Sequence, residues 1–226
     1  MRWQTLWEGK WILFVLVAAT VAAWFYQPWM AAVPAALLLF TLWFFRDPPR
    51  RIPEGPGLIV SPADGRITDI EEIEELELLN RRVRRIGIFL SVFDVHVNRA
   101  PAAGRIVYCA EFEGTYYDAR SPAASTHNTA RTWGFECEGG LLLVVRQITG
   151  AIARRIVPWA KLDETVTRGE RFGMIRFGSR TEITLPLDAE LAVRVGQKVK
   201  GGSSVLARLA PVAAKTSAPE KEIASA

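Results

Sequence analysis

The chain has 226 residues and a mass of 25.2 kDa, enough for one ordinary domain and a smaller appended segment. Half of the residues are hydrophobic and 23% are charged, which excludes a wholly disordered chain. The net charge of +4 and the pI of about 9.3 favour an anionic partner, without choosing between a membrane surface and nucleic acid.

The first predicted element is an apolar helical hairpin over residues 1–46. No charged residue occurs between Lys10 and Arg46, and a single helix of that length would reach roughly 50 Å, well beyond a hydrocarbon core of about 30 Å. Gln27-Pro28 interrupts the stretch, because proline cannot donate a backbone hydrogen bond. We therefore expect helices over 11–26 and 29–45. There are two alternatives to the hairpin. The stretch could be a cleaved signal peptide, or it could be one tilted span followed by an interfacial helix.

The charges that flank this hairpin predict its orientation. Basic residues lie both before and after the apolar stretch, and such residues favour the cytoplasmic side of a membrane. We expect the hairpin to lie in the cell (inner) membrane, with both of its ends and the following domain in the cytoplasm.

The remainder is predicted to be one mainly β (α+β) domain of the barrel-sandwich type over residues 58–210, after a Pro/Gly-rich linker over 47–57. The segment 195–207 resembles the hairpin of lipoyl- and biotinyl-type barrel-sandwich domains. Residues 211–226 are rich in Ala, Lys, Ser, Pro and Glu, and we expect a disordered tail. Short β-branched runs predict strands over residues 58–60, 66–70, 86–97, 105–112, 141–148, 151–157, 174–177 and 182–185.

A strongly charged stretch lies inside this domain. Five glutamates between Glu71 and Glu77 precede four arginines between Arg81 and Arg85. We interpret the stretch as a solvated turn or short helix with an ion-paired face. A role of the arginines in holding anionic lipid headgroups is the alternative.

Three short segments could carry chemistry. Ser61-Pro-Ala-Asp64-Gly65 by itself indicates only a tight turn. In a strand over 93–99, alternation would place Asp94 and His96 on one face, where a carboxylate could tune an imidazole for acid–base work. An exposed polar sheet face produces the same alternation. The third segment contains Gly178-Ser179. Taken alone, a Gly-Ser pair before a strand is typical of an ordinary turn.

Taken together, the segments SPADGRI (61–67), FDVHVNRAP (93–101) and GMIRFGSR (173–180) resemble the phosphatidylserine decarboxylases, in particular their short bacterial and archaeal form. ITGAIARRIV (148–157) and VGQKVKGGSSVLA (195–207) extend the resemblance over nearly the whole chain. The resemblance implies a carboxy-lyase that converts phosphatidylserine in the bilayer to phosphatidylethanolamine and CO2. It implies a pyruvoyl group as the only cofactor, with no metal and no pyridoxal phosphate.

The resemblance also implies a proenzyme that cleaves itself at Gly178–Ser179. The products would be residues 1–178 and 179–226, which remain associated. Ser179 would become the pyruvoyl group, whose carbonyl forms a Schiff base with the amine of the lipid. Gly202-Ser203 is a rival cleavage site, and we reject it because GMIRFGSR carries the lead-in typical of the family.

The family pattern implies roles for further residues. Asp64 and His96 would partner Ser179 in self-cleavage, His96 would reprotonate the product carbanion, and Asp94 would orient or tune His96. The chain departs from the pattern at Arg99, where long-form members have a second histidine. It departs again in the loop over 125–130, which keeps its asparagine but lacks a Glu-Arg pair. We expect substrate binding by Arg99, Asn128 and His127.

Two other classes of protein stay open. A membrane-anchored barrel-sandwich adaptor or carrier without catalysis would explain the hairpin and the β runs, but it would not need Gly178-Ser179. A nucleic-acid-binding module would explain the basic pI, but basic and aromatic residues do not interleave outside the N-terminal segment, so we expect no nucleic-acid partner. The sequence leaves the oligomeric state open, with a homo-oligomer among the options.

Overall fold

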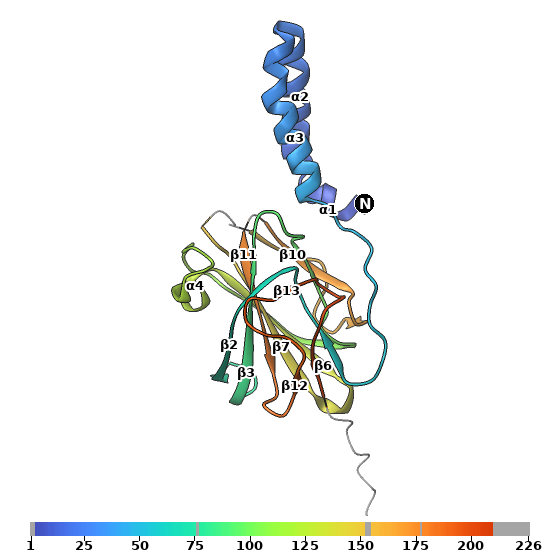
Figure 1. Cartoon of the computed structure of the whole chain (residues 1–226), viewed down its shortest axis with the longest axis vertical. Coiled ribbons are helices and arrows are strands. Elements are labelled where there is room, and N and C mark those ends of the chain that lie inside the picture. Colours follow the sequence, from blue (N-terminus) through green and yellow to red (C-terminus); the bar gives the residue numbers. More distant parts are fainter. Residues whose placement is uncertain (1–2, 76, 152–154, 177, 210–226) are drawn as a thin grey trace, which may run out of the picture.

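The fold is mainly β, with a helical N-terminal projection (Figure 1). The computed structural model describes residues 3–75, 77–151, 155–176 and 178–209. The helices are α1 (Trp3–Glu8), α2 (Lys10–Tyr26), η1 (Pro28–Ala31), α3 (Ala32–Phe44), α4 (Pro122–His127) and η2 (Glu138–Gly140). The strands are β1 (Leu58–Val60), β2 (Gly65–Glu75), β3 (Arg81–Leu90), β4 (Val97–Arg99), β5 (Gly104–Phe112), β6 (Ala130–Cys137), β7 (Leu142–Ile148), β8 (Arg155–Pro158), β9 (Thr165–Val166), β10 (Arg171–Arg176), β11 (Ser179–Leu185), β12 (Glu190–Leu191), β13 (Lys198–Val199) and β14 (Val205–Arg208).

An eight-stranded antiparallel sheet forms the body of the β domain, in the order β13-β2-β3-β11-β7-β6-β5-β9. Two three-stranded sheets, β1-β14-β12 and β4-β10-β8, complete the domain. The main core contains fully buried aromatic and β-branched side chains, which suit a pleated, packed surface. Among them are Trp133, Phe135, Phe172, Ile88 and Ile106. The predicted mainly β class is confirmed.

The predicted strand over 86–97 is wrong after Leu90. The chain turns at Ser91, whose backbone N–H and hydroxyl both donate to the carboxylate of Asp94, at 2.9 and 2.7 Å. The Asp94 N–H in turn donates to the Ser91 carbonyl. Such local side-chain hydrogen bonds offer the backbone an alternative to the sheet ladder. The alternating face proposed for residues 92–98 therefore does not exist, and β4 joins a different sheet from β3.

The prediction of a turn or short helix over residues 71–77 is also wrong, because residues 71–75 belong to β2. This strand pairs with β3 so that Glu71 faces Arg85 and Glu72 faces Arg84. Opposite charges facing each other across two strands stabilise the pairing. The ion-paired face itself is present: Arg85 lies 2.6 Å from Glu71, and Arg82 lies 3.0 Å from Glu72.

The C-terminal segment 195–207 does not form the expected two-stranded hairpin. β13 pairs with β2, whereas β14 pairs with β1 and β12. A tight turn separates them, in which the N–H groups of Ser203 and Ser204 both donate to the Lys200 carbonyl and redirect the chain. The expected tail over 211–226 lies outside the described residues.

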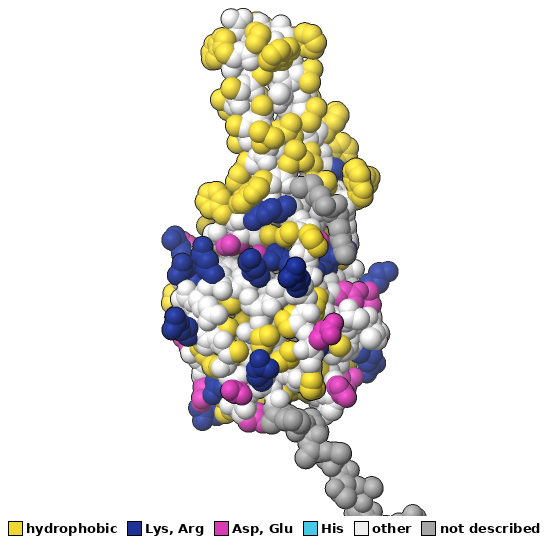
Figure 2. Space-filling view, turned by 45° about the vertical axis from the view of Figure 1, so that its right-hand side comes forward, with side chains coloured by type: hydrophobic (Ala, Val, Ile, Leu, Met, Phe, Trp, Pro, Cys, Tyr) yellow, Lys and Arg dark blue, Asp and Glu magenta, His cyan; other side chains and the backbone are white. Residues whose placement is uncertain are grey.

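A helical hairpin is present at the N-terminus. Helices α2 and α3 contact each other along their length, and η1, which starts at Pro28, joins them. The pair projects away from the β domain (Figure 1) and carries many exposed hydrophobic side chains (Figure 2). None of the helices within the described ranges is both long and apolar enough to cross a membrane. Helix α1, which precedes the hairpin, was not predicted.

Buried ion pairs tie the linker to the β domain. Asp47 is 4% exposed and pairs with Arg99 at 2.5 Å and with Arg171 at 3.4 Å. Arg50 donates to both carboxylate oxygens of Asp64, each at 2.9 Å. The linker is therefore held in place by charge rather than by regular secondary structure.

Neutralising Asp47 tests this attachment. Asp47→Asn leaves the buried Arg99 without its counter-charge, so we expect the free energy of unfolding to fall by about 3 kcal/mol or more. Denaturant unfolding of the detergent-solubilised protein measures the change. Glu72→Gln, which neutralises one half of the exposed pair with Arg82, is the matched control and should leave stability within about 0.5 kcal/mol. Equal losses in the two variants would contradict the prediction.

Candidate active site

The structure brings together the three segments that the sequence singled out. β10 pairs with β4, and the Ile175 N–H donates to the carbonyl of His96 at 3.2 Å. The first segment lies against the same strand, because Asn98 Nδ2 and the Arg99 N–H both donate to the Pro62 carbonyl. These contacts place the end of β10, and so the Gly178–Ser179 bond, beside His96.

His96 is fully buried and both of its ring nitrogens are hydrogen-bonded. The Gly178 N–H donates to Nε2 at 3.1 Å, and Nδ1 lies 3.0 Å from the carbonyl oxygen of Asp94. A backbone N–H can only donate, so Nε2 carries no proton and the neutral ring holds its proton on Nδ1. The structure therefore presents a neutral imidazole whose unprotonated nitrogen faces the Gly178 backbone.

Burial keeps this imidazole neutral. It lowers the pKa of His96 from 6.5 to about 4, because desolvation outweighs the hydrogen bond and the charge of Asp94, which both raise the pKa. The ring of Phe44 lies over the imidazole, with 4.4 Å between the ring centroids. At neutral pH this histidine is therefore in the unprotonated form that a base requires.

Ser179 lies directly after a glycine whose backbone conformation other residues rarely adopt. Gly178 has φ +70°, in the left-handed region that favours glycine. Ser179 begins β11 and is fully buried, and its Oγ has no hydrogen-bond partner among the described residues. A desolvated hydroxyl without a partner is costly, and such groups occur where a catalytic role retains them.

The carbonyl of Gly178 is approached closely by Gly150. A Cβ atom at residue 150 would lie 2.6 Å from the Gly178 oxygen, so only glycine permits this contact. Gly150 lies within ITGAIARRIV (148–157), one of the segments that carry the family resemblance, and the sequence predicted no role for it. No local signal could have identified it, because the contact joins two segments far apart in the chain.

The expected Asp64–His96 pair is not formed. Both nitrogens of His96 are taken, and Asp64 instead binds Arg50 and accepts the Gly201 N–H at 2.8 Å. A nearby arginine and a backbone donor together satisfy this carboxylate more fully than a neutral imidazole could. Asp94 does orient His96, although through its backbone carbonyl, since its carboxylate caps Ser91.

The three residues expected to bind substrate have other contacts in the structure. Arg99 is buried against Asp47 and donates to the Gly169 carbonyl. Asn128 is buried, and its side-chain amide forms hydrogen bonds with the backbone of Tyr117 and Thr149. His127 is exposed, with its ring 6.2 Å from that of Tyr117. Arg99 and Asn128 thus hold loops in this structure, and only His127 is accessible.

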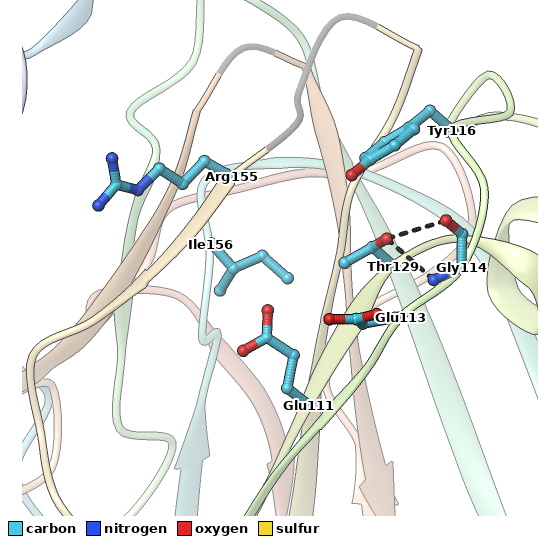
Figure 3. A pocket seen from close by; sticks show the side chains of 7 residues that line it. All are labelled: Glu111, Glu113, Gly114, Tyr116, Thr129, Arg155 and Ile156. Atoms are coloured by element: carbon cyan, nitrogen blue, oxygen red, sulfur yellow. Dashed lines mark hydrogen bonds between the residues drawn. The ribbon is translucent and has the colours of Figure 1, made fainter.

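A polar cavity of about 450 Å³ lies near the upper edge of the β domain (Figure 3). Thr129 Oγ1 in its wall accepts the Gly114 N–H and donates to the Gly114 carbonyl, whereas the Arg155 guanidinium points away from the carboxylates. None of His96, Gly178 and Ser179 lines this cavity. Within the described ranges, no three His, Cys, Asp or Glu side chains converge as metal ligands.

Comparisons with known proteins identify the family of the chain. The family model described as phosphatidylserine decarboxylase matches residues 37–207. A phosphatidylserine decarboxylase proenzyme of Symbiobacterium thermophilum is 44% identical over 202 residues, which cover 89% of this chain and 94% of the relative. Proenzymes of the same description from Syntrophus aciditrophicus and Zymomonas mobilis are 43% and 40% identical, over 88% and 89% of this chain and 94% and 85% of each relative. The chain belongs to the phosphatidylserine decarboxylase family.

Proposed function

We propose that this chain is a proenzyme that cleaves itself between Gly178 and Ser179 and then decarboxylates phosphatidylserine to phosphatidylethanolamine and CO2. The observation that carries the proposal is the buried, unpartnered hydroxyl of Ser179 directly after Gly178, whose N–H is bound to neutral His96. A nucleophile, a base and the backbone carbonyl to be attacked therefore occupy one buried site.

Self-cleavage needs only groups of the chain itself. Ser179 Oγ attacks the Gly178 carbonyl carbon and its proton passes to His96, so that an ester replaces the amide once the Ser179 nitrogen takes up a proton. Removal of the Ser179 Cα proton then expels the Gly178 carboxylate and leaves dehydroalanine. Addition of water and loss of ammonia leave a pyruvoyl group at residue 179. His96 Nε2 must first release the Gly178 N–H, which is a local movement at a flexible glycine.

The site fits a pyruvoyl group. The Ser179 side chain is buried without a polar partner among the described residues, and its backbone is fixed by pairing with Leu90 of β3. When formed, the group supplies a carbonyl that accepts electrons as CO2 leaves the substrate. His96 is the residue placed to hold or deliver a proton there, with Asp94 fixing its ring.

The two products of cleavage should remain associated. β11 is paired with β3 on one side and with β7 on the other, so its strand belongs to the centre of the main sheet. Arg180, the next residue after Ser179, donates to both carboxylate oxygens of Asp69 of β2 at 2.7 Å, so this ion pair joins residues of the two products. These buried contacts lie within the folded domain and do not depend on the Gly178–Ser179 bond.

We place the protein at the cell (inner) membrane with its β domain in the cytoplasm. Aromatic side chains at the tip of the hairpin are mostly exposed, namely Trp24, Phe25, Tyr26 and Trp29. Exposed apolar surface of this extent marks a membrane or partner site. Lys and Arg side chains gather on the β domain just below the hairpin (Figure 2), where anionic lipid headgroups would attract them.

Replacing the nucleophile is the direct test of cleavage. In Ser179→Ala no oxygen is available to attack Gly178, so we expect an uncleaved chain with no decarboxylase activity. Intact-mass measurement of the purified protein shows whether fragments 1–178 and 179–226 form. Ser203→Ala, at the rival Gly-Ser bond, is the matched control and should cleave normally. A cleaved Ser179→Ala or an uncleaved Ser203→Ala would overturn the assignment.

The pH dependence of self-cleavage tests His96 as the base. Because burial lowers its pKa, the neutral form is present above about pH 4 and is lost as the pH falls through about 4. We expect the cleavage rate of freshly made precursor to stay level between about pH 7 and pH 5 and to fall with a midpoint near 4. A midpoint near 6.5, the ordinary value for histidine, would show that His96 is not the buried base described above.

Removing the exposed aromatic rings of the hairpin tests membrane attachment. The triple variant Trp24→Ser, Phe25→Ser and Trp29→Ser lowers the apolar area available for insertion, so we expect most of the protein to leave the liposome fraction in a flotation assay. Leu162→Ser, which alters an exposed apolar residue of the β domain, is the control and should float as the parent does. If the triple variant floated with the liposomes as the parent does, the assignment of the hairpin as a membrane anchor would be contradicted.

A further inference from the structure

The base of the hairpin packs directly on the candidate site. Phe44 and Phe45, at the end of α3, are fully buried in a small apolar cluster with Val157 of β8 and Met174 of β10. Leu6 of α1 packs against the same cluster. Figure 1 shows α1 and the lower end of α3 where the projection meets the β domain. The hairpin thus has an exposed outer part and a buried base.

Phe44 contacts the catalytic base itself. Its ring lies over the His96 imidazole at 4.4 Å between centroids, with 36° between the ring planes. Both side chains have no exposed area. Because the two nitrogens of His96 are already hydrogen-bonded, an apolar ring against its face excludes water and fixes the plane of the imidazole without competing for its polar atoms.

Phe45 is accommodated by a glycine in the preceding helical segment. A Cβ atom at Gly9 would lie 2.6 Å from the Phe45 ring, so a side chain there would displace the ring. Gly9 lies between α1 and α2, which means that the start and the end of the hairpin interlock at its base. The buried base is therefore a specifically packed contact and not a loose apposition of apolar residues.

Polar contacts join the same base to both segments of the site. The Glu8 carboxylate pairs at 2.8 Å with Arg176, which ends β10 two residues before Gly178, and the Glu8 backbone carbonyl accepts a second bond from this arginine. Arg46 donates to the Phe93 carbonyl at 2.7 Å, three residues before His96. The end of β10 that leads to Gly178 and the connection before β4 that contains His96 are thus both attached to the N-terminal segment 1–46.

We infer that the base of the hairpin, defined as Leu6, Glu8, Phe44 and Phe45, is part of the self-cleavage machinery as well as of the anchor. Phe44 and Glu8 are positioning residues: the first holds His96, and the second holds the end of β10 that leads to Gly178. The anchor and the catalytic domain therefore cannot be separated without loss of the reaction, even where no membrane is needed. The inference rests on the proposed self-cleavage.

The experiment measures self-cleavage of the full-length precursor in detergent, where membrane attachment does not contribute. Phe44→Ala opens space beside His96, and we expect cleavage to slow by about tenfold or more, since small misplacements of reacting groups cost rates of this order. Phe44→Leu keeps an apolar side chain there and should recover most of the rate. Trp7→Ala, which removes an exposed ring from α1, is the matched control and should cleave at the parental rate.

A pH profile separates positioning of His96 from a general structural effect. The charged groups that act on His96 are Asp94, which raises its pKa, and Arg46, which lowers it, and both are unchanged in Phe44→Ala. Water admitted by that variant should move the midpoint of the cleavage profile from near 4 towards 6.5. A parental rate and midpoint in Phe44→Ala would overturn the inference, and so would a Trp7→Ala as slow as Phe44→Ala.

Glu8→Gln keeps the inference testable if Phe44→Ala does not fold. Glu8 is partly exposed and its replacement retains the backbone carbonyl bond to Arg176, so the fold should survive. We expect cleavage to slow by roughly threefold or more, because the end of β10 loses its charged attachment. A parental rate in Glu8→Gln would exclude it as a positioning residue. Failure of the unaltered chain to cleave would instead contradict the proposed function.

Discussion

The hydrogen bond from the Gly178 N–H to the neutral imidazole of His96 is the interaction on which the site depends. It exists only because β4 pairs with β10 and because the ring is kept unprotonated by burial. The same bond holds Gly178 in place and occupies the nitrogen that, in the proposed mechanism, takes up the proton of Ser179. Ser179, the next residue after Gly178, is buried with His96, and its Oγ is not hydrogen-bonded to the imidazole.

Buried arginines shape the rest of the molecule around that bond. Arg50, Arg99 and Arg180 are each paired with a carboxylate and largely withdrawn from solvent. Removing such a charge from water is costly, and its pairing must be nearly complete to offset the loss of hydration. These pairs join the linker to the domain and β11 to its neighbours. The net positive charge of the chain thus includes many arginines that serve the fold and are not available to a partner.

Much of the fold could be predicted because hydrophobic periodicity is local. The strands at 58–60 and 105–112 follow from β-branched runs between turn residues, and the break at Pro28 follows from its missing donor. β6, over Ala130–Cys137, was not predicted from the sequence. Its residues mix charged, aromatic and glycine side chains without clear alternation. It is a strand because β5 and β7 flank it on both sides, and this tertiary context overrides its weak local preference.

The sequence by itself determined the mainly β class and the apolar hairpin, and it contains Gly178-Ser179 and His96 within the segments that carry the family resemblance. Only the tertiary structure decided which groups meet. Asp64 binds Arg50 rather than His96, Asp94 acts through its carbonyl, and Phe44 covers the imidazole. Partners of this kind depend on strand register and on competition among donors and acceptors that lie far apart in the sequence, and no local pattern records that competition.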